Sequence, residues 1–284
     1  MARFAFLGIG LMGSRMSMRL LQAGHALSIW NRSAAACAPL ATQGAQVLAD
    51  LSQPITAEVI GLCFADDQAV QQVAARLIPQ LQAGQIVVDF SSITAETTRD
   101  LAAQAQARGA YWVDAPVSGG VMGAERGTLV IFAGGDVEAI GKLDDFFAPL
   151  SQRVSHMGDS GAGQVTKICN QLIVAANSTL IAEAVALAQR AGVDAVQLAP
   201  ALVGGFADSI PLQLLAPRMA KHCFEPVQWK VQTLNKDLSN ALHLAESLGL
   251  QIPVADRAKQ QLQQQVNAGQ ATADLSSIIQ LYQD

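Results

Sequence analysis

Apolar and polar residues alternate in blocks along the first half of the chain, and these blocks have the lengths of strands and helices. Short apolar runs that fit buried strands occur at residues 4–7, 26–30, 59–64, 85–90, 111–113 and 129–133. Amphipathic stretches that predict helices follow several of them, at residues 14–22, 68–81, 94–107 and 137–150. Strands that alternate with helices of this length indicate an α/β fold with a parallel, doubly wound sheet.

The pattern changes in the second half of the chain. One stretch with neither Pro nor Gly runs from residue 164 to residue 190, which predicts a helix about 40 Å long. It is apolar on most sides, so we expect it to be buried at a domain or subunit interface. Beyond it every stretch is helical, with short Gly and Pro breaks. We therefore predict two domains, an α/β domain at 1–162 and an all-α domain at 163–284 that begins with the long helix.

The first strand leads directly into a glycine motif, Gly8-x-Gly10-x-x-Gly13, and a second strand ends at Trp30. Gly8 permits a tight turn, Gly10 lets the backbone approach a pyrophosphate, and Gly13 lets helix and strand pack closely. The glycines alone are weak evidence, but the flanking strands make them a dinucleotide-binding, Rossmann-type fingerprint. The predicted cofactor contacts of this loop are Gly8, Ile9, Gly10, Leu11, Met12 and Gly13.

The end of the second strand bears on which dinucleotide binds. Enzymes that use NAD usually carry Asp or Glu here to bind the ribose 2′-hydroxyl, whereas this chain has Asn31-Arg32-Ser33. Arg32 can pair with a 2′-phosphate and Ser33 can donate a hydrogen bond to it. We therefore predict that NADP(H) is preferred and NAD(H) possible. Ligands of such sheets bind beyond the carboxyl ends of the strands, which adds Leu62, Cys63 and Ser92 to the predicted cofactor site.

Composition narrows the classes of function. The chain has 284 residues, 51% of them hydrophobic and 14% charged, so it can bury a sizeable core. Its net charge of −5, with no basic stripe, argues against a nucleic-acid partner. No run of about 18 residues is uninterruptedly apolar, so we expect no transmembrane helix and no membrane partner. The scattered cysteines and histidines lack metal-ligand spacing, so we expect reduced thiols, no metal and a cytoplasmic location.

Lys167 is the candidate for chemistry in the long helix, and Asn170 follows at i+3 on the same face. A buried lysine is costly unless it has a partner or a task, and burial or a nearby positive charge lowers its pKa. Lys167 can then act as general acid in carbonyl reduction and general base in alcohol oxidation. The alternative is a lysine whose ammonium group reaches the surface at a helix start.

The segment after the fifth strand ends in Ser118-Gly119-Gly120. Such a loop leaves backbone N–H groups open to an anion, for example a substrate carboxylate. An ordinary glycine-rich turn explains the composition equally well.

Four motifs in this order resemble those of the β-hydroxyacid dehydrogenase family, which includes 3-hydroxyisobutyrate dehydrogenases, tartronate semialdehyde reductases and glyoxylate/succinic semialdehyde reductases. The resemblance covers nearly the whole chain. The motifs are Phe6–Gly13, Asp114–Gly120, Gly161–Asn170 and Lys236-Asp237.

This resemblance implies roles for individual residues. Lys167 would be the catalytic lysine, and the substrate would be held by Asn170 and, through its carboxylate, by Ser118, Gly119 and Gly120. Ser92 would lie near the nicotinamide ribose, and Lys236 near the cofactor. The family has an Asn-Asn pair where this chain has Asn170-Gln171, so the role of the second position is open. Phe206 and Asp208 lie where family members line the substrate pocket, although a plain loop between helices is an equal alternative.

We therefore expect an NADP-dependent oxidoreductase that interconverts a small 3-hydroxy acid and its semialdehyde by hydride transfer, and that forms a homodimer or homotetramer. One rival is an imine reductase of the same architecture, which generally replaces the lysine. Another is a non-catalytic cofactor-binding interaction module. Retention of Lys167 argues against both.

Overall fold

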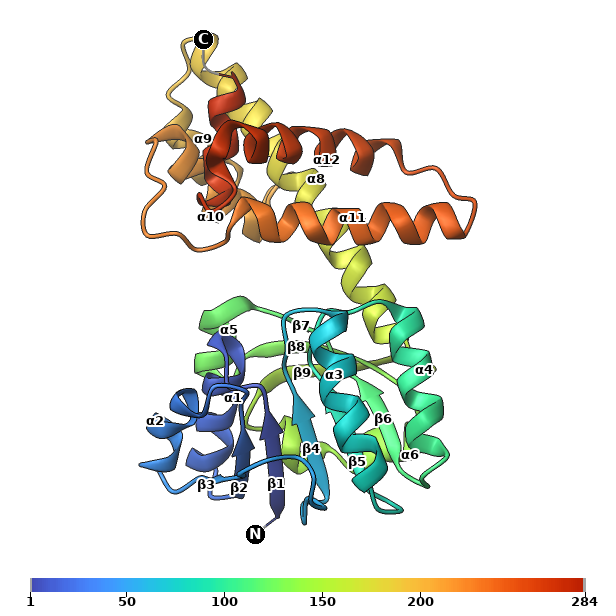
Figure 1. The fold of residues 1–284 in the computed structure, drawn as a ribbon. Coiled ribbons are helices and arrows are strands. Elements are labelled where there is room, and N and C mark those ends of the chain that lie inside the picture. The colour runs from blue at the N-terminus through green and yellow to red at the C-terminus, as the bar shows by residue number, and fades with distance from the viewer. Residues whose placement is uncertain (1, 283–284) are drawn as a thin grey trace. The chain divides into compact units, whose positions relative to one another are not determined.

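The computed structural model of the chain describes residues 2–282 and comprises two compact units, one up to Lys167 and one from Ile168 on. The first contains a β-sheet covered by helices, and the second is helical (Figure 1). The predicted α/β class with an all-α second part is therefore confirmed. The predicted domain boundary, between residues 162 and 163, falls at the start of the helix that links the units and stays a prediction.

The centre of the first unit is a run of parallel strands, β1 (Arg3–Leu7), β2 (Ala26–Trp30), β3 (Gln46–Val47), β4 (Val59–Leu62), β5 (Ile86–Asp89) and β6 (Tyr111–Asp114). They lie in the order β3-β2-β1-β4-β5-β6. This is the order of doubly wound dinucleotide-binding sheets, and it reverses between β1 and β4. The crevice at that reversal, beyond the carboxyl ends of the strands, is where such sheets bind their ligands.

The far edge of the sheet departs from the parallel arrangement that the alternation of strands and helices predicts. It is formed by β7 (Val117–Ser118), β8 (Leu129–Gly134) and β9 (Ser151–Gly158). β8 is antiparallel to β6 and β7 and parallel to β9. The sequence did not predict β7 or β9, because β7 has only two residues and β9 is a polar, largely exposed strand without an apolar run.

Helices cover both faces of the sheet. In β1, Phe4 and Phe6 belong to one hydrophobic core and Ala5 and Leu7 to another, because alternate residues of a strand point to opposite faces. The first core includes residues of α1 (Leu11–Gln22), α2 (Ala38–Ala41), α5 (Gly120–Arg126), α6 (Val137–Gly141) and α7 (Asp144–Phe147). The second includes residues of α3 (Asp67–Leu77) and α4 (Ala95–Gln106), which lie in front of β4 to β6 in Figure 1. The single helix expected at 137–150 is thus two short helices.

The second unit is a helical bundle around its own core. Its helices are α8 (Ala162–Arg190), which begins in the first unit, α9 (Leu198–Leu202), α10 (Ile210–Ala220), α11 (Val231–Ser247) and α12 (Pro253–Gln265). A 3₁₀ segment at Leu275–Tyr282 packs its apolar side chains into the same core. Short 3₁₀ or π turns extend other helices at Ala34–Cys37, Ile78–Gln80, Ala195–Gln197 and Val266–Gln270.

The long helix α8 is less buried than its apolar sequence predicts. Ile173, Leu180 and Leu187, spaced seven residues apart, are exposed. Within residues 2–282, α8 is the helix with the length and mean hydropathy (1.5) of a membrane span, and 44% of its most apolar stretch is buried. Core helices of soluble proteins pass the same test, so this is weak evidence for a membrane segment.

Candidate active site

The glycine loop between β1 and α1 has the backbone geometry that a dinucleotide needs. Gly8 has φ +97°, and a Cβ there would lie 2.3 Å from the Cys63 carbonyl oxygen. A Cβ on Gly13 would lie 2.0 Å from the Gly8 carbonyl oxygen. A Cβ on Gly10 would meet no protein atom within 4 Å. Gly8 and Gly13 are thus required by the protein itself, whereas the space beside Gly10 is open for a pyrophosphate at the α1 N-terminus.

Asn31 closes this loop from the end of β2. Its Oδ1 accepts the Ile9 N–H at 3.0 Å, and its Nδ2 donates to the Ser33 carbonyl oxygen at 3.1 Å. Asn31 therefore holds the glycine loop against the segment after β2. Arg32 and Ser33 are exposed at that segment, so their side chains are accessible to a ligand. Leu11 is also exposed, and Met12 is half-buried.

The ends of β4 and β5 contribute the next predicted residues. Leu62 is completely buried in the core, so the structure gives its side chain a packing role. Cys63, which follows, donates its N–H to the Leu7 carbonyl oxygen. Burial and the negative charge of Asp89 raise the pKa of the Cys63 thiol to about 12, so it is a neutral thiol and not a thiolate nucleophile. Ser92 is half-buried in the loop after β5.

Two buried carboxylates lie side by side below these loops. Asp89 ends β5 and Asp114 ends β6, and the two are paired in the register of the strands. Burial raises the pKa of Asp89 to about 7, which the negative charges of Asp114 and Asp67 reinforce and hydrogen bonds from Ser91 oppose. Burial also raises the pKa of Asp114, although backbone N–H groups that it accepts act in the other direction.

Asp114 joins the sheet to the start of α8. Its Oδ1 accepts the Gly161 N–H at 2.8 Å and its Oδ2 accepts the Gln164 N–H at 2.9 Å. Gln164 in turn donates through Nε2 to the Ser91 carbonyl oxygen and accepts the Ile93 N–H through Oε1. Lys167 is half-buried and lies on α8 at i+3 from Gln164. The first turn of α8 is therefore tied to the carboxyl ends of β5 and β6.

The Ser118–Gly120 segment starts from the same edge of the sheet. Ser118 ends β7 and is half-buried. Gly119 has φ +122° and, like Gly120, is exposed. The predicted residues of the first unit thus lie at or just after the ends of β1, β2, β4, β5, β7 and β9.

Asn170 and Lys236 belong to the second unit, where two motifs meet. Asn170 Nδ2 donates to Gln171 Oε1 at 2.8 Å, and Gln171 Nε2 donates to Asp237 Oδ2. Gln171 is buried, and Asp237 follows Lys236 on α11. The lengthened side chain at position 171 therefore connects Asn170 with the Lys236-Asp237 motif, a role that the sequence left open.

The loop that contains Phe206 and Asp208 is stabilised from within. Asp208 accepts the Gly204 N–H and the Gln213 Nε2 group, both at 2.7 Å. Phe206 is fully exposed. These contacts fit the alternative of a loop between helices, and we give neither residue a place in the site.

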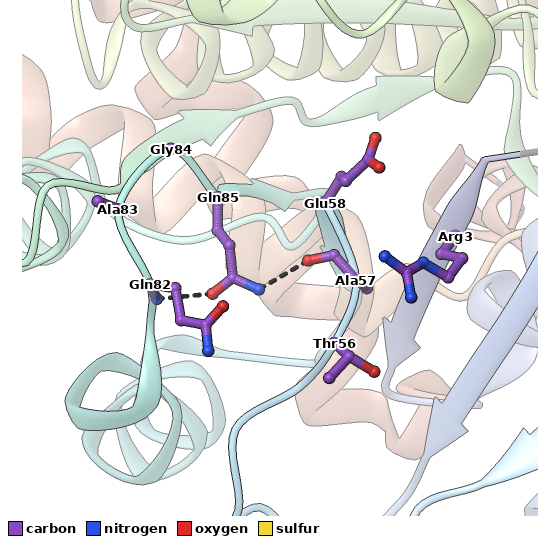
Figure 2. Close-up of a pocket in the computed structure, with 8 residues that line it drawn as sticks. All are labelled: Arg3, Thr56, Ala57, Glu58, Gln82, Ala83, Gly84 and Gln85. Carbon is purple, nitrogen blue, oxygen red and sulfur yellow. Dashed lines mark hydrogen bonds between the residues drawn. The ribbon is translucent and has the colours of Figure 1, made fainter.

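A pocket elsewhere in the first unit is not part of this site. It lies at the amino ends of β1, β4 and β5, where Arg3 and Glu58 are exposed (Figure 2). The Gln85 side chain spans its wall, donating to the carbonyl oxygens of Ile55 and Ala57 and accepting the Gln82 N–H. Ligands of parallel sheets bind at the opposite, carboxyl edge. All amide atoms of Gln85 are engaged, so this wall is a structural link.

The part of the chain that the structure describes contains neither a metal-binding cluster nor a disulfide bond. No group of three or more His, Cys, Asp and Glu side chains in residues 2–282 is placed to hold a metal ion. The cysteines Cys37, Cys63, Cys169 and Cys223 are free thiols.

Sequence reasoning did not identify Asp89 and assigned no supporting role to Asp114, Gln164 and Asp237, although these three lie in the quoted motifs. An aspartate as the last residue of two neighbouring buried strands is the signal that was present. The partners of these aspartates, however, lie many residues away along the chain.

The chain resembles known proteins over its whole length. The family description "NAD binding domain of 6-phosphogluconate dehydrogenase" matches residues 3–158, and "NAD-binding of NADP-dependent 3-hydroxyisobutyrate dehydrogenase" matches residues 161–282. A 2-hydroxy-3-oxopropionate reductase of Escherichia coli (strain K12) is 33% identical over 98% of this chain and 96% of that protein. A 3-hydroxyisobutyrate dehydrogenase of Pseudomonas aeruginosa is 32% identical over 99% of both chains.

Solved structures agree with these relatives. The 3-hydroxyisobutyrate dehydrogenase of Mycobacterium tuberculosis, solved with L-serine, superposes with a TM-score of 0.91 over all of both chains at 27% identity. An imine reductase from Pseudomonas sp. has a TM-score of 0.65 over 98% of both chains at 21% identity, which shows a shared fold alone. With both of its halves matched and a full-length relative at 33% identity, this chain belongs to the 3-hydroxyisobutyrate dehydrogenase family of NAD(P)-dependent oxidoreductases, the β-hydroxyacid dehydrogenases.

Proposed function

We propose that the protein interconverts a small 3-hydroxy acid and its semialdehyde, with NADP(H) as the preferred hydride carrier and Lys167 as the group that moves the proton. The observation that carries this proposal is the position of Lys167 in the first unit. Gln164 bonds to Ser91 and Ile93 on either side of Ser92, so the lysine-bearing helix and the loop assigned to the nicotinamide ribose are held by the same contacts.

The cofactor is assigned to the carboxyl edge of the sheet. The open space at Gly10 and the backbone of Ile9, Leu11 and Met12, between Gly8 and Gly13, would receive the pyrophosphate. Arg32 and Ser33 would pair with a 2′-phosphate, and Asn31 would hold the two loops together. Cys63 and Ser92 would border the nicotinamide end, and the resemblance also assigns Lys236 to the cofactor. When bound, the cofactor supplies or accepts a hydride at C4 of its nicotinamide ring.

The substrate is assigned to polar groups that suit a carboxylate. The Ser118 hydroxyl and the backbone of Gly119 and Gly120 would bind the carboxylate, and the Asn170 amide would hold the hydroxyl or carbonyl end. Lys167 would donate a proton to the carbonyl oxygen during reduction and take it back during oxidation. Holding the reactants in place would supply much of the acceleration.

Replacement of Lys167 tests the proposal. In Lys167→Ala we expect kcat to fall by about 10²- to 10⁴-fold, because a positioned acid or base contributes that much. NADPH affinity, measured by fluorescence titration, should change by less than about 3-fold. Turnover is followed as NADPH oxidation with glyoxylate, succinic semialdehyde and tartronate semialdehyde, and as NADP⁺ reduction with 3-hydroxyisobutyrate and serine.

The matched control is Lys221→Ala, which removes an exposed lysine at the end of α10 and should behave as wild type. Near-normal turnover by Lys167→Ala would remove the lysine from the mechanism. Turnover of a cyclic imine in preference to every semialdehyde would favour an imine reductase. Absence of turnover with all of these substrates would favour the non-catalytic module.

We also propose a homodimer or homotetramer in the cytoplasm, without a nucleic-acid or membrane partner. Ile173, Leu180 and Leu187 are exposed at a seven-residue spacing that suits packing between helices, and the net charge of −5 disfavours nucleic acid. Sedimentation equilibrium of the purified protein measures the oligomeric state.

A further inference from the structure

One buried carboxylate links two motifs, Asp114–Gly120 and Gly161–Asn170, whose first residues have no role in the cofactor and substrate assignments. We propose that Asp114, together with Gln164, is a positioning residue for the catalytic lysine: it caps the first turn of α8 from the end of β6 and so fixes Lys167 against the strand ends that receive the cofactor. This inference rests on the proposed role of Lys167.

Asp114 caps helix α8 with its side chain although it lies far from that helix in the sequence. The first N–H groups of a helix have no acceptor within the helix, and an anion near them also favours the helix dipole. Asp114 accepts two such groups, from Gly161 and Gln164, across 47 and 50 residues of chain. Two aspartates that cap helices locally, Asp66 on α3 and Asp136 on α6, are by contrast exposed and cap helices that begin at the next residue.

The surroundings of Asp114 are shaped to hold its carboxylate. A Cβ on Gly134 would lie 2.6 Å from Asp114 Oδ1. A Cβ on Gly163 would lie 2.8 Å from Asp114 Oδ2 and 2.3 Å from the Phe132 carbonyl oxygen. Only glycine fits at both positions, so strand β8 and helix α8 close around the carboxylate. Burying a charge in this way is costly compared with an exposed cap, which points to a requirement beyond helix stability.

Gln164 supplies the second connection. Its side chain is buried and bonds to the backbone on both sides of Ser92. Asp114 and Gln164 together connect the first turn of α8 to the sheet through four hydrogen bonds. Two of these bonds involve Asp114 at the end of β6, and two join Gln164 to the loop after β5. Lys167 lies on the next turn of the same helix, so a shift of the first turn displaces its ammonium group. A displacement of about 1 Å can cost about 100-fold in rate.

The test uses the full-length protein carrying Asp114→Asn. Asparagine has the same shape but accepts only one of the two N–H groups. We expect kcat per NADPH-binding site to fall by about 10- to 100-fold, with NADPH affinity within about 3-fold of wild type. The deuterium isotope effect on kcat with [4-²H]NADPH should rise as hydride transfer becomes rate-limiting. Hydrogen–deuterium exchange at residues 161–166 should accelerate.

The matched control is Asp136→Asn, which weakens the exposed cap of α6. It should lower stability without changing kcat, the isotope effect or exchange in α8. A purely structural role for Asp114 would reduce the folded fraction but leave kcat per binding site and the isotope effect unchanged, and that result would overturn the proposal.

If Asp114→Asn does not fold, Gln164→Met replaces it. A fall in kcat with NADPH affinity retained supports the proposal, and an unchanged kcat overturns it. Near-normal turnover by Lys167→Ala would instead overturn the role of the lysine on which the inference rests.

Discussion

Asn31 is a predicted cofactor residue whose side chain is fully engaged within the protein. Its oxygen is occupied by Ile9 and its nitrogen by Ser33, so its visible task is to hold two loops in register. We therefore propose that its neighbours determine the preference for NADP over NAD. Arg32 and Ser33 are exposed there, and a positive charge beside the ribose favours a 2′-phosphate.

Charge reversal at Arg32 tests this division of tasks. In Arg32→Glu we expect the dissociation constant of NADPH to rise by about 10- to 100-fold, because a carboxylate repels the 2′-phosphate. The dissociation constant of NADH should change by less than about 3-fold. Both are measured by fluorescence titration. Arg153→Glu, the same reversal at an exposed arginine of β9, serves as the control. Equal weakening of both cofactors would show that Arg32 does not contact the 2′-phosphate.

At this scale the sequence was informative where a residue is defined by its chain neighbours. The glycine spacing and the absence of an acid at the end of β2 were visible without coordinates. The bond from Asn31 to Ile9 was not, because it joins residues 22 positions apart in an irregular loop.

Among the elements, the glycine loop contains glycines that the fold requires and one that the fold does not require. The Cβ positions of Gly8 and Gly13 are filled by backbone atoms, whereas that of Gly10 is open. The protein alone therefore explains two of the glycines, and we attribute the third to the approach of a ligand.

A pair of alanine substitutions makes this difference measurable. Gly13→Ala should destabilise the protein by about 1–3 kcal/mol, because its Cβ would overlap the Gly8 carbonyl and force helix α1 away from β1. Gly10→Ala should change stability by less than about 0.5 kcal/mol and still lose NADPH binding. Urea unfolding and fluorescence titration measure the two effects. If Gly10→Ala binds NADPH normally, the pyrophosphate does not lie beside Gly10.

Other elements have ends that the hydrophobic pattern does not predict. The pattern at 137–150 predicted one helix, but the chain turns after Gly141 to form α6 and α7. α8 begins at Ala162, and its first turn is capped by Asp114 from another element. Local periodicity detects a helix but not the distant group that stabilises its end.

In the molecule as a whole, the buried carboxylates at the ends of β5 and β6 affect stability and also support the candidate site. Asp89 and Asp114 face each other in register, and the pKa of Asp89 is raised to about 7 by burial and by its negative neighbours. The folded protein therefore keeps the Asp89 proton between about pH 4 and pH 7, where the unfolded chain has lost it. This contribution to stability is complete at low pH and disappears as pH rises through 7.

Asp89→Asn should weaken this pH dependence. Asparagine does not titrate, so its free energy of unfolding should fall less than that of wild type between pH 5 and pH 8. Each unit of pKa difference contributes about 1.4 kcal/mol. Urea unfolding followed by circular dichroism at several pH values measures the slope, with Asp136→Asn as the control for loss of a carboxylate. Parallel curves for wild type and Asp89→Asn would mean that Asp89 titrates as in the unfolded chain.

The sequence by itself determined the two-part α/β and all-α organisation, the dinucleotide fingerprint and the candidate lysine. Each of these is expressed in residues close together in the chain, as strand and helix periodicity or as a short motif. Only the tertiary structure decided that Asp114 caps α8, that Gln171 connects Asn170 to Asp237, and that a polar edge strand completes the sheet. The bonds of Asp114 to α8 and of Gln171 to Asp237 join residues 47 to 66 positions apart. A buried polar group finds such a partner through the folding of the whole chain rather than through any local pattern.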